Sequence, residues 1–130
     1  MIYALVCLVM LIEIADHKTI EDLQQKFSDC FSMLKLEFYE QPHQRYEVPE
    51  ENQPLSQYSQ LDLIRKNHTH GFLAFFSHTK TSSFESELRE KYGLHVQVLR
   101  KQFGKWQQTT GTDQLTLGEQ QKLALLQIIH

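Results

Sequence analysis

A strand, a helix and a second strand follow one another twice along this 130-residue chain. The first copy runs from Leu11 to Tyr39 and the second from Phe72 to Arg100. A shift of 61 positions brings the apolar helix residues of the two copies together: Leu23, Phe27 and Phe31 fall on Phe84, Leu88 and Tyr92. Apolar residues three or four positions apart lie on one face of a helix. The repeat therefore predicts two helices packed on a layer of strands, which is a compact α+β sandwich.

The predicted helices begin at capping boxes, in which a hydroxyl side chain precedes a carboxylate by three residues. The pattern occurs at Thr19–Asp22 in the first copy, at Ser82–Glu85 in the second, and at Thr116–Glu119 before a terminal helix. Gly93 follows the second helix and suits a left-handed C-cap. These signals predict three helices with defined starts.

The rest of the chain connects or follows the two copies, and we predict one domain over residues 1–130. Residues 11–40 form the first unit, 41–70 a loop and a short helix within Leu55–Lys66, 71–101 the second unit, and 102–130 a hairpin strand and the terminal helix. The strands after each helix alternate apolar and polar residues, as expected for one buried face. We therefore predict a ferredoxin-like sandwich from a duplicated β-α-β unit, with a mainly antiparallel four-stranded sheet. A connector helix and a C-terminal hairpin plus helix are additions to it.

The hairpin after the second unit allows two turns. A three-residue turn, Gln102–Gly104, sets Arg100 opposite Trp106 and allows a cation–π pair. A two-residue turn instead pairs Lys101 with Trp106, and the sequence does not decide between them.

The polar stretch after this hairpin contains the candidate ligand-binding residues. Arg100, Trp106, Thr110 and Asp113 would border one concave patch. The simpler interpretation, which we favour, places Trp106 under the terminal helix and lets Asp113 shape the turn before that helix. If the protein has a specific site, we expect it in these additions rather than in the repeated units.

The histidines and Cys30 lack the neighbouring residues that metal binding or nucleophilic catalysis requires. His68, His70 and His78 flank the predicted strand Phe72–Phe76, but no cysteine or carboxylate nearby completes a metal-ligand set. Cys30 lies in an apolar part of the first helix and is predicted to pack in the core. We therefore predict no metal site, no cofactor and no catalytic residue, and we lean against an enzyme.

Composition argues against a nucleic-acid partner. The 13 Lys and Arg residues form no run, and the formal net charge is −3. The aromatic residues after Gly71 also miss the alternate spacing found in RNA-binding strands.

The N-terminal stretch Ile2–Ile12 is apolar throughout and has no preceding Lys or Arg. It is too short for a membrane span, which needs about 20 apolar residues. It also lacks the features of a cleaved signal, so we interpret it as a buried strand with Met10–Ile14 as its core. With two cysteines and no disulfide framework, we expect a cytoplasmic protein without stable membrane insertion.

Part of the C-terminal third resembles a signature of small uncharacterised bacterial proteins. It consists of Gly93–Lys101 (GLHVQVLRK), Trp106 and Thr109–Gln120 (TTGTDQLTLGEQ). No activity is attached to that group. The resemblance implies a stand-alone bacterial domain and transfers no catalytic residue.

Two classes of function fit these features. The first is a non-enzymatic protein-interaction or regulatory module, with a homodimer through exposed sheet edges or through the open sheet face as one form. The second is a small-molecule-binding or enzymatic domain with a polar site around the C-terminal hairpin. We favour the first class, because the charged residues show no paired-carboxylate, triad or phosphate-loop pattern. A cavity shared by Arg100, Trp106 and Asp113 would favour the second class.

Overall fold

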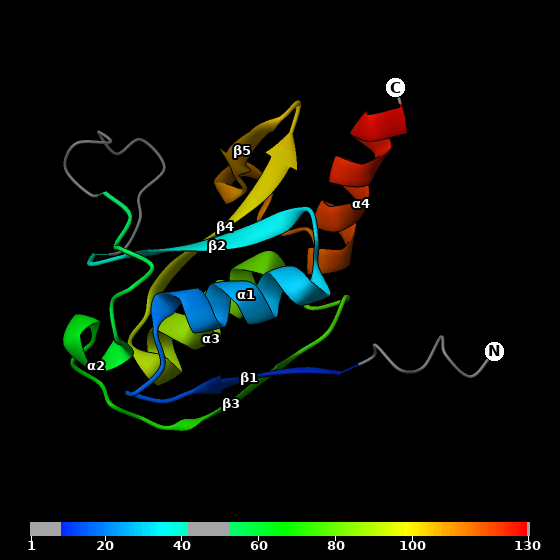
Figure 1. Ribbon diagram of the computed structural model, residues 1–130. Helices are drawn as coiled ribbons and strands as arrows, with labels where there is room; N and C mark the ends of the chain where they lie inside the picture. The colour runs from blue at the N-terminus through cyan, green and yellow to red at the C-terminus, as the bar shows by residue number, and fades with distance from the viewer. Residues whose placement is uncertain (1–8, 42–52, 130) are drawn as a thin grey trace.

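The strands form two antiparallel sheets, and two helices lie between these sheets (Figure 1). The computed structural model describes residues 9–41 and 53–129. The elements in chain order are β1 (Met10–Ile14), α1 (Ile20–Cys30), β2 (Leu34–Tyr39), α2 (Leu61–Ile64), β3 (Gly71–Phe75), α3 (Thr81–Tyr92), β4 (His95–Gln102), β5 (Lys105–Gln108), a 3₁₀ turn (Thr110–Thr112) and α4 (Leu117–Ile129). The protein is therefore of mixed α+β class, as predicted.

Strand pairing links the two halves of the chain. β1 pairs with β3 in one sheet, and the other sheet has the order β2-β4-β5, with every pair antiparallel. The first strands of the two units thus pair with each other, and so do the second strands. Each sheet turns an apolar face toward α1 and α3, so the core is enclosed between two sheets. The ferredoxin-like arrangement is not confirmed, because it requires one four-stranded sheet with both helices on one face.

An aromatic cluster in the middle of the molecule joins α1, β3 and α3. The ring centroids of Phe27 and Phe84 are 5.2 Å apart, and Phe75 lies 5.1 Å from Phe84. All three side chains are buried. The predicted apolar stripes of both helices are confirmed by the buried residues Ile20, Leu23 and Phe27 in α1 and Phe84, Leu88 and Tyr92 in α3.

The repeat extends to the helices that follow the two units. Backbone N–H groups at the start of α1 donate to carbonyl groups just before α2, and those at the start of α3 donate to carbonyl groups just before α4. The four bonds run from Ile20 to Ser59, from Glu21 to Gln57, from Thr81 to Leu115 and from Ser82 to Asp113. The first N–H groups of α2 and α4 in turn donate to the carbonyl groups of Lys18 and Thr79. The connector and terminal helices, predicted as additions, thus occupy equivalent places in the repeat.

The helix starts show which capping signals are used. The box at Thr19 is confirmed, because Thr19 Oγ1 accepts from Asp22 N at 3.2 Å and Thr19 N donates to Asp22 Oδ2 at 2.9 Å. The box at Thr116–Glu119 is also confirmed. The predicted box at Ser82–Glu85 is wrong: α3 begins earlier, at Thr81, and the backbone before α4 takes its first N–H groups.

Other local expectations have mixed outcomes. Gly93 has a φ of +69° and caps α3 as predicted. The connector helix is short, Leu61–Ile64. Cys30 is exposed rather than packed in the core, because it lies off the apolar stripe of α1. Met10–Ile14 forms the predicted strand, whereas residues 1–8 of the apolar N-terminal stretch lie outside the described residues.

Candidate functional site

A polar cavity of about 170 Å³ opens between α3, the first part of β4 and the segment after β5. β5 pairs with β4 only from Leu99 onward, so it does not cover the earlier part of this strand. The lining residues are Glu85 and Arg89 of α3, His95, Val96 and Gln97 of β4, and Thr110 and Asp113. Two carboxylates, a guanidinium and an imidazole in so small a volume are typical of a binding or active site.

Glu85 is the group of this cavity whose ionisation is most perturbed. Its side chain is half-buried, and Oε2 accepts a hydrogen bond from the backbone N–H of Val98 at 2.8 Å. Burial raises the pKa of Glu85 to about 7, and the charge of Asp113 adds to that rise. The Val98 N–H and the Arg89 guanidinium act in the opposite direction. Near neutral pH both forms of the Glu85 carboxyl are therefore populated.

Neither carboxylate of the cavity is paired with a cation of the described chain. Within residues 9–41 and 53–129, no Lys, Arg or His forms an ion pair with Glu85 or Asp113. Arg89 instead donates to Ser86 Oγ at 3.1 Å and lies 3.9 Å from a carboxylate oxygen of Glu90. When both carboxylates are ionised, their negative charge therefore exceeds the positive charge of the single guanidinium that lines the cavity.

His95 forms one wall of the cavity and is half-buried. Burial lowers the pKa of His95, and the positive charge of Arg89 lowers it further. Its Nδ1 atom is inaccessible to solvent and has no hydrogen-bond partner among the described residues. The imidazole is thus mainly neutral at pH 7 and does not balance the two carboxylates.

The first half of the chain has an equivalent cavity with different chemistry. It measures about 240 Å³ and is lined by Glu21, Gln24, Gln25, Ser28, Lys35 and Gln57. Gln24 stands at the place of Glu85, because each lies four residues after the first residue of its helix. Gln57 stands at the place of Asp113, because the carbonyl group of each bonds to the second N–H of a helix. Neutral amides in the first half thus correspond to carboxylates in the second.

The structure brings two of the four predicted site residues into the cavity. Thr110 and Asp113 line it, whereas Arg100 and Trp106 do not. The strand register pairs Trp106 with Lys101, so the hairpin has the two-residue turn. The expected concave patch is therefore formed only in part, and ligand binding by these four residues stays a prediction.

Arg100 lies in the interior and ties β4 to the start of α4. It donates hydrogen bonds to Oε1 of Gln102 at 2.9 Å, to Oε1 of Gln120 and to Oγ1 of Thr112 at 3.4 Å. Gln120 is fully buried and donates to the carbonyl group of Thr112 at 2.8 Å. Burial lowers the pKa of Arg100. These contacts give Arg100 a structural role, because they join β4 to the start of α4.

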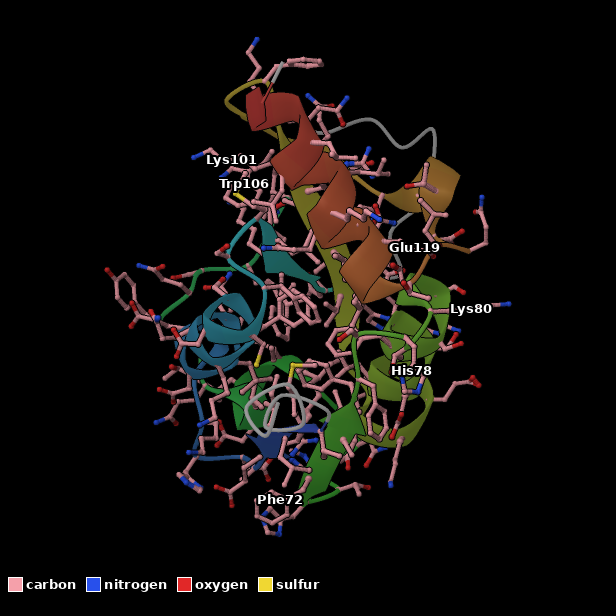
Figure 2. All side chains as sticks on the ribbon, turned by 90° about the vertical axis from the view of Figure 1, so that its right-hand side faces the viewer. Phe72, His78, Lys80, Lys101, Trp106 and Glu119 are labelled. Atoms are coloured by element: carbon pink, nitrogen blue, oxygen red, sulfur yellow. The ribbon has the colours of Figure 1, made fainter. Side chains whose placement is uncertain are left out.

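Trp106 lies on the hairpin beside Lys101 (Figure 2). The ammonium groups of Lys35 and Lys101 are 5.0 Å and 6.0 Å from the centroid of its ring. The side chain is 39% exposed. It is therefore not buried under α4, and the simpler interpretation of this residue is wrong.

The histidines near β3 contact carboxylates. His68 Nδ1 lies 2.9 Å from Asp16 Oδ2, and His70 Nε2 lies 2.9 Å from Glu13 Oε2. Asp16 also accepts from the buried Arg65 at 2.8 Å, and Arg65 donates to the last carbonyl group of α3. Within the described ranges, no three His, Cys, Asp or Glu side chains are placed to hold a metal ion.

Sequence reasoning missed Glu85, Arg89 and His95 as site residues. It assigned Glu85 to a capping box, which the structure does not use. The repeat itself contains a better signal, because the shift of 61 positions sets Glu85 against Gln24. A half-buried ionisable residue in a cavity, where the other half of the repeat has a neutral one, is a candidate for a functional role.

Comparison of the chain with family models, curated proteins and solved structures gives no match. No helix in the described parts of the chain has the length and apolar character needed to cross a bilayer.

Proposed function

We propose that this protein is a small-ligand-binding domain whose ligand presents a cationic group, such as an ammonium or an amidinium, to Glu85 and Asp113. The observation that carries this proposal is the exchange of Gln24 and Gln57 in the first half for these two carboxylates in the second. Because the same backbone frame is built with neutral amides, the fold does not require charge at these places. The carboxylates are better explained by a ligand.

A cationic ligand would remove the unfavourable electrostatics of the cavity. Burial and repulsion between the carboxylates disfavour the ionised pair, and the raised pKa of Glu85 reflects both effects. A cation between the two carboxylates would replace lost solvation and cancel the repulsion. The volume of about 170 Å³ suits a compact metabolite.

The remaining lining residues would orient such a ligand. The Arg89 guanidinium can bind an acidic or carbonyl group at the other end of the molecule. Thr110 Oγ1 donates to Gln97 Oε1 at 3.3 Å, which holds both side chains at the wall. A small zwitterion therefore matches the distribution of charge in the cavity.

Binding is better supported than catalysis. A carboxyl with a pKa near 7 suits general acid–base catalysis. However, the described lining residues include no Cys, Ser or Lys that could act as a nucleophile, and the Thr110 hydroxyl is already bonded.

Titration calorimetry with small amines, guanidines and size-matched neutral and anionic compounds tests this proposal. We expect binding only of compounds that carry a cationic group, with an affinity that rises between about pH 6 and pH 8 because ionised Glu85 is the binding form. Glu85→Gln and Asp113→Asn should each weaken binding by about tenfold or more. Glu87→Gln, at an exposed position of the same helix, is the matched control and should bind as the wild type. Failure of the whole panel to bind, or equal binding by Glu85→Gln, would contradict the proposal.

A protein-interaction module is the second candidate, and we propose the outer face of β1 and β3 as its surface. Leu11 and Phe72 point outward there and are 52% and 59% exposed, and a groove of about 420 Å³ lies between β1 and α1. Figure 2 shows Phe72 at the opposite end of the molecule from Lys101 and Trp106. Light scattering tests the homodimeric form. A dimer that Phe72→Ser converts to a monomer would support it, and a wild-type monomer at all concentrations would contradict it.

A further inference from the structure

The turn between β4 and β5 holds a large apolar side chain that lies almost entirely outside the core. Phe103 is 81% exposed, and its backbone φ is +52°. With Gly104, at a φ of +77°, it forms the two-residue turn of the hairpin. Such turns favour Asn, Asp or Gly, because other side chains are strained at positive φ. A strained and exposed Phe at this tip is therefore better explained by contact with another molecule or surface than by a requirement of the fold.

The surroundings of Phe103 are basic and aromatic. Lys101 and Lys105 flank the turn and are exposed. Trp106 has the ammonium groups of Lys101 and Lys35 near its ring. No acidic residue occurs in β4, the turn or β5. In a chain of net charge −3, this tip is locally positive.

The C-terminal part of α4 projects at the same end of the molecule. Figures 1 and 2 both show this helix and the tip of the hairpin extending away from the two sheets in the same direction. Leu123, Leu125 and Leu126 of this helix are 37%, 43% and 42% exposed. Two apolar projections at one end of the molecule suit binding to a flat surface better than insertion into a single pocket of a partner.

We infer that this end of the protein binds peripherally to a membrane surface that contains anionic lipids. Phe103 enters the boundary between headgroups and acyl chains, and the indole of Trp106 lies at the headgroup level, where aromatic rings with a polar group are favoured. Lys101 and Lys105 face the lipid phosphates, and their attraction is screened by salt. This contact is adsorption by a hairpin tip, and it involves no membrane span.

Sedimentation of the full chain with vesicles tests this inference. Vesicles of phosphatidylcholine alone are compared with vesicles of phosphatidylcholine and phosphatidylserine. We expect binding to the mixed vesicles only, a loss of binding at high salt, and a blue shift in the emission of Trp106, the single tryptophan of the chain.

Two matched variants distinguish binding by the hairpin tip from nonspecific binding by other apolar surface residues. Phe103→Asn removes the apolar side chain and suits positive φ, so it remains folded, and its binding should fall by about tenfold or more. Leu63→Asn is the control, because Leu63 is 80% exposed on α2, away from the tip, and this variant should bind as the wild type. All three proteins share Ile2–Ile12, so binding through that apolar stretch is equal among them.

Three vesicle results would overturn the inference. They are no binding to the mixed vesicles, equal binding by Phe103→Asn and the wild type, and an equal loss of binding in Leu63→Asn. Binding to polyglutamate without binding to vesicles would also overturn it and would assign the tip to an acidic protein partner.

Discussion

Replacement of Glu85 by Gln should make the protein more stable above neutral pH, because it removes a carboxyl whose ionisation opposes folding. In the folded protein, burial and Asp113 raise the pKa of this group from 4.5 to about 7. The folded state then holds the proton more tightly than the unfolded state, so the wild type loses stability as pH rises from about 4.5 through 7. The difference between 4.5 and about 7, at about 1.4 kcal/mol per pH unit, corresponds to about 3 kcal/mol when ionisation is complete.

Urea unfolding of the wild type and Glu85→Gln measures this effect. The variant should fold, because Gln24 occupies the equivalent place in the first half and a Gln oxygen can accept the Val98 N–H. The stability difference in favour of the variant should grow by about 2–3 kcal/mol between about pH 5 and pH 8. Asp113→Asn should make the pH dependence smaller, since it removes the neighbouring negative charge.

The control is Glu87→Gln, on the exposed face of α3. Its stability should follow that of the wild type across the same pH range. If the difference between Glu85→Gln and the wild type stays constant within about 0.5 kcal/mol, burial does not perturb Glu85 and the electrostatic reasoning about the cavity is refuted.

Three further predictions can be checked by chemical denaturation. Thr19→Ala and Thr116→Ala should each cost about 1 kcal/mol because both hydroxyls cap helices, whereas Ser82→Ala should change stability by less than about 0.5 kcal/mol; an equal cost at all three would contradict the assignment of caps. Trp106→Ala should cost about 1 kcal/mol, because the indole is partly exposed and contacts lysines. A cost of about 3–5 kcal/mol would instead indicate a core residue. Arg65→Met should cost about 3 kcal/mol, since it removes a buried guanidinium that bonds to Asp16 and leaves two carbonyl groups unbonded; a neutral result would show that these bonds do not contribute to stability.

Local elements follow from the sequence much better than their pairing does. The stripe that contains Phe27 and the capping box at Thr19 are local signals, and both are confirmed. Alternation in β2 indicates which face is buried, but it does not specify which strand lies alongside. β1 and β3 are distant in sequence, and their pairing depends on how both halves enclose the aromatic core. This is why one four-stranded sheet is predicted where two sheets form.

The candidate site is predicted in part for a similar reason. Asp113 and Thr110 stand out because they lie in a polar stretch between two elements. Glu85 has the spacing of a capping residue, and only the distant carbonyl groups before α4 show that this cap is unnecessary. The turn at Phe103 contradicts local preference, because Phe rarely adopts positive φ. At Glu85 a tertiary contact outweighs the local capping signal, whereas at the hairpin the sequence allows two turns and does not decide between them.

The bonds at the start of α3 determine when this part of the protein can finish folding during its synthesis. The N–H group of Thr81 bonds to the carbonyl group of Leu115, which leaves the ribosome 34 residues later. The first N–H groups of α1 likewise bond to the carbonyl groups of Gln57 and Ser59, which are synthesised later. Neither helix can bond its first two N–H groups to these carbonyl groups as it emerges, and nearly the whole chain must be made before both starts are closed. Nascent chains that end before Asp113 would expose the open start of α3, and such incompletely folded chains are the kind of intermediate that chaperones protect from aggregation.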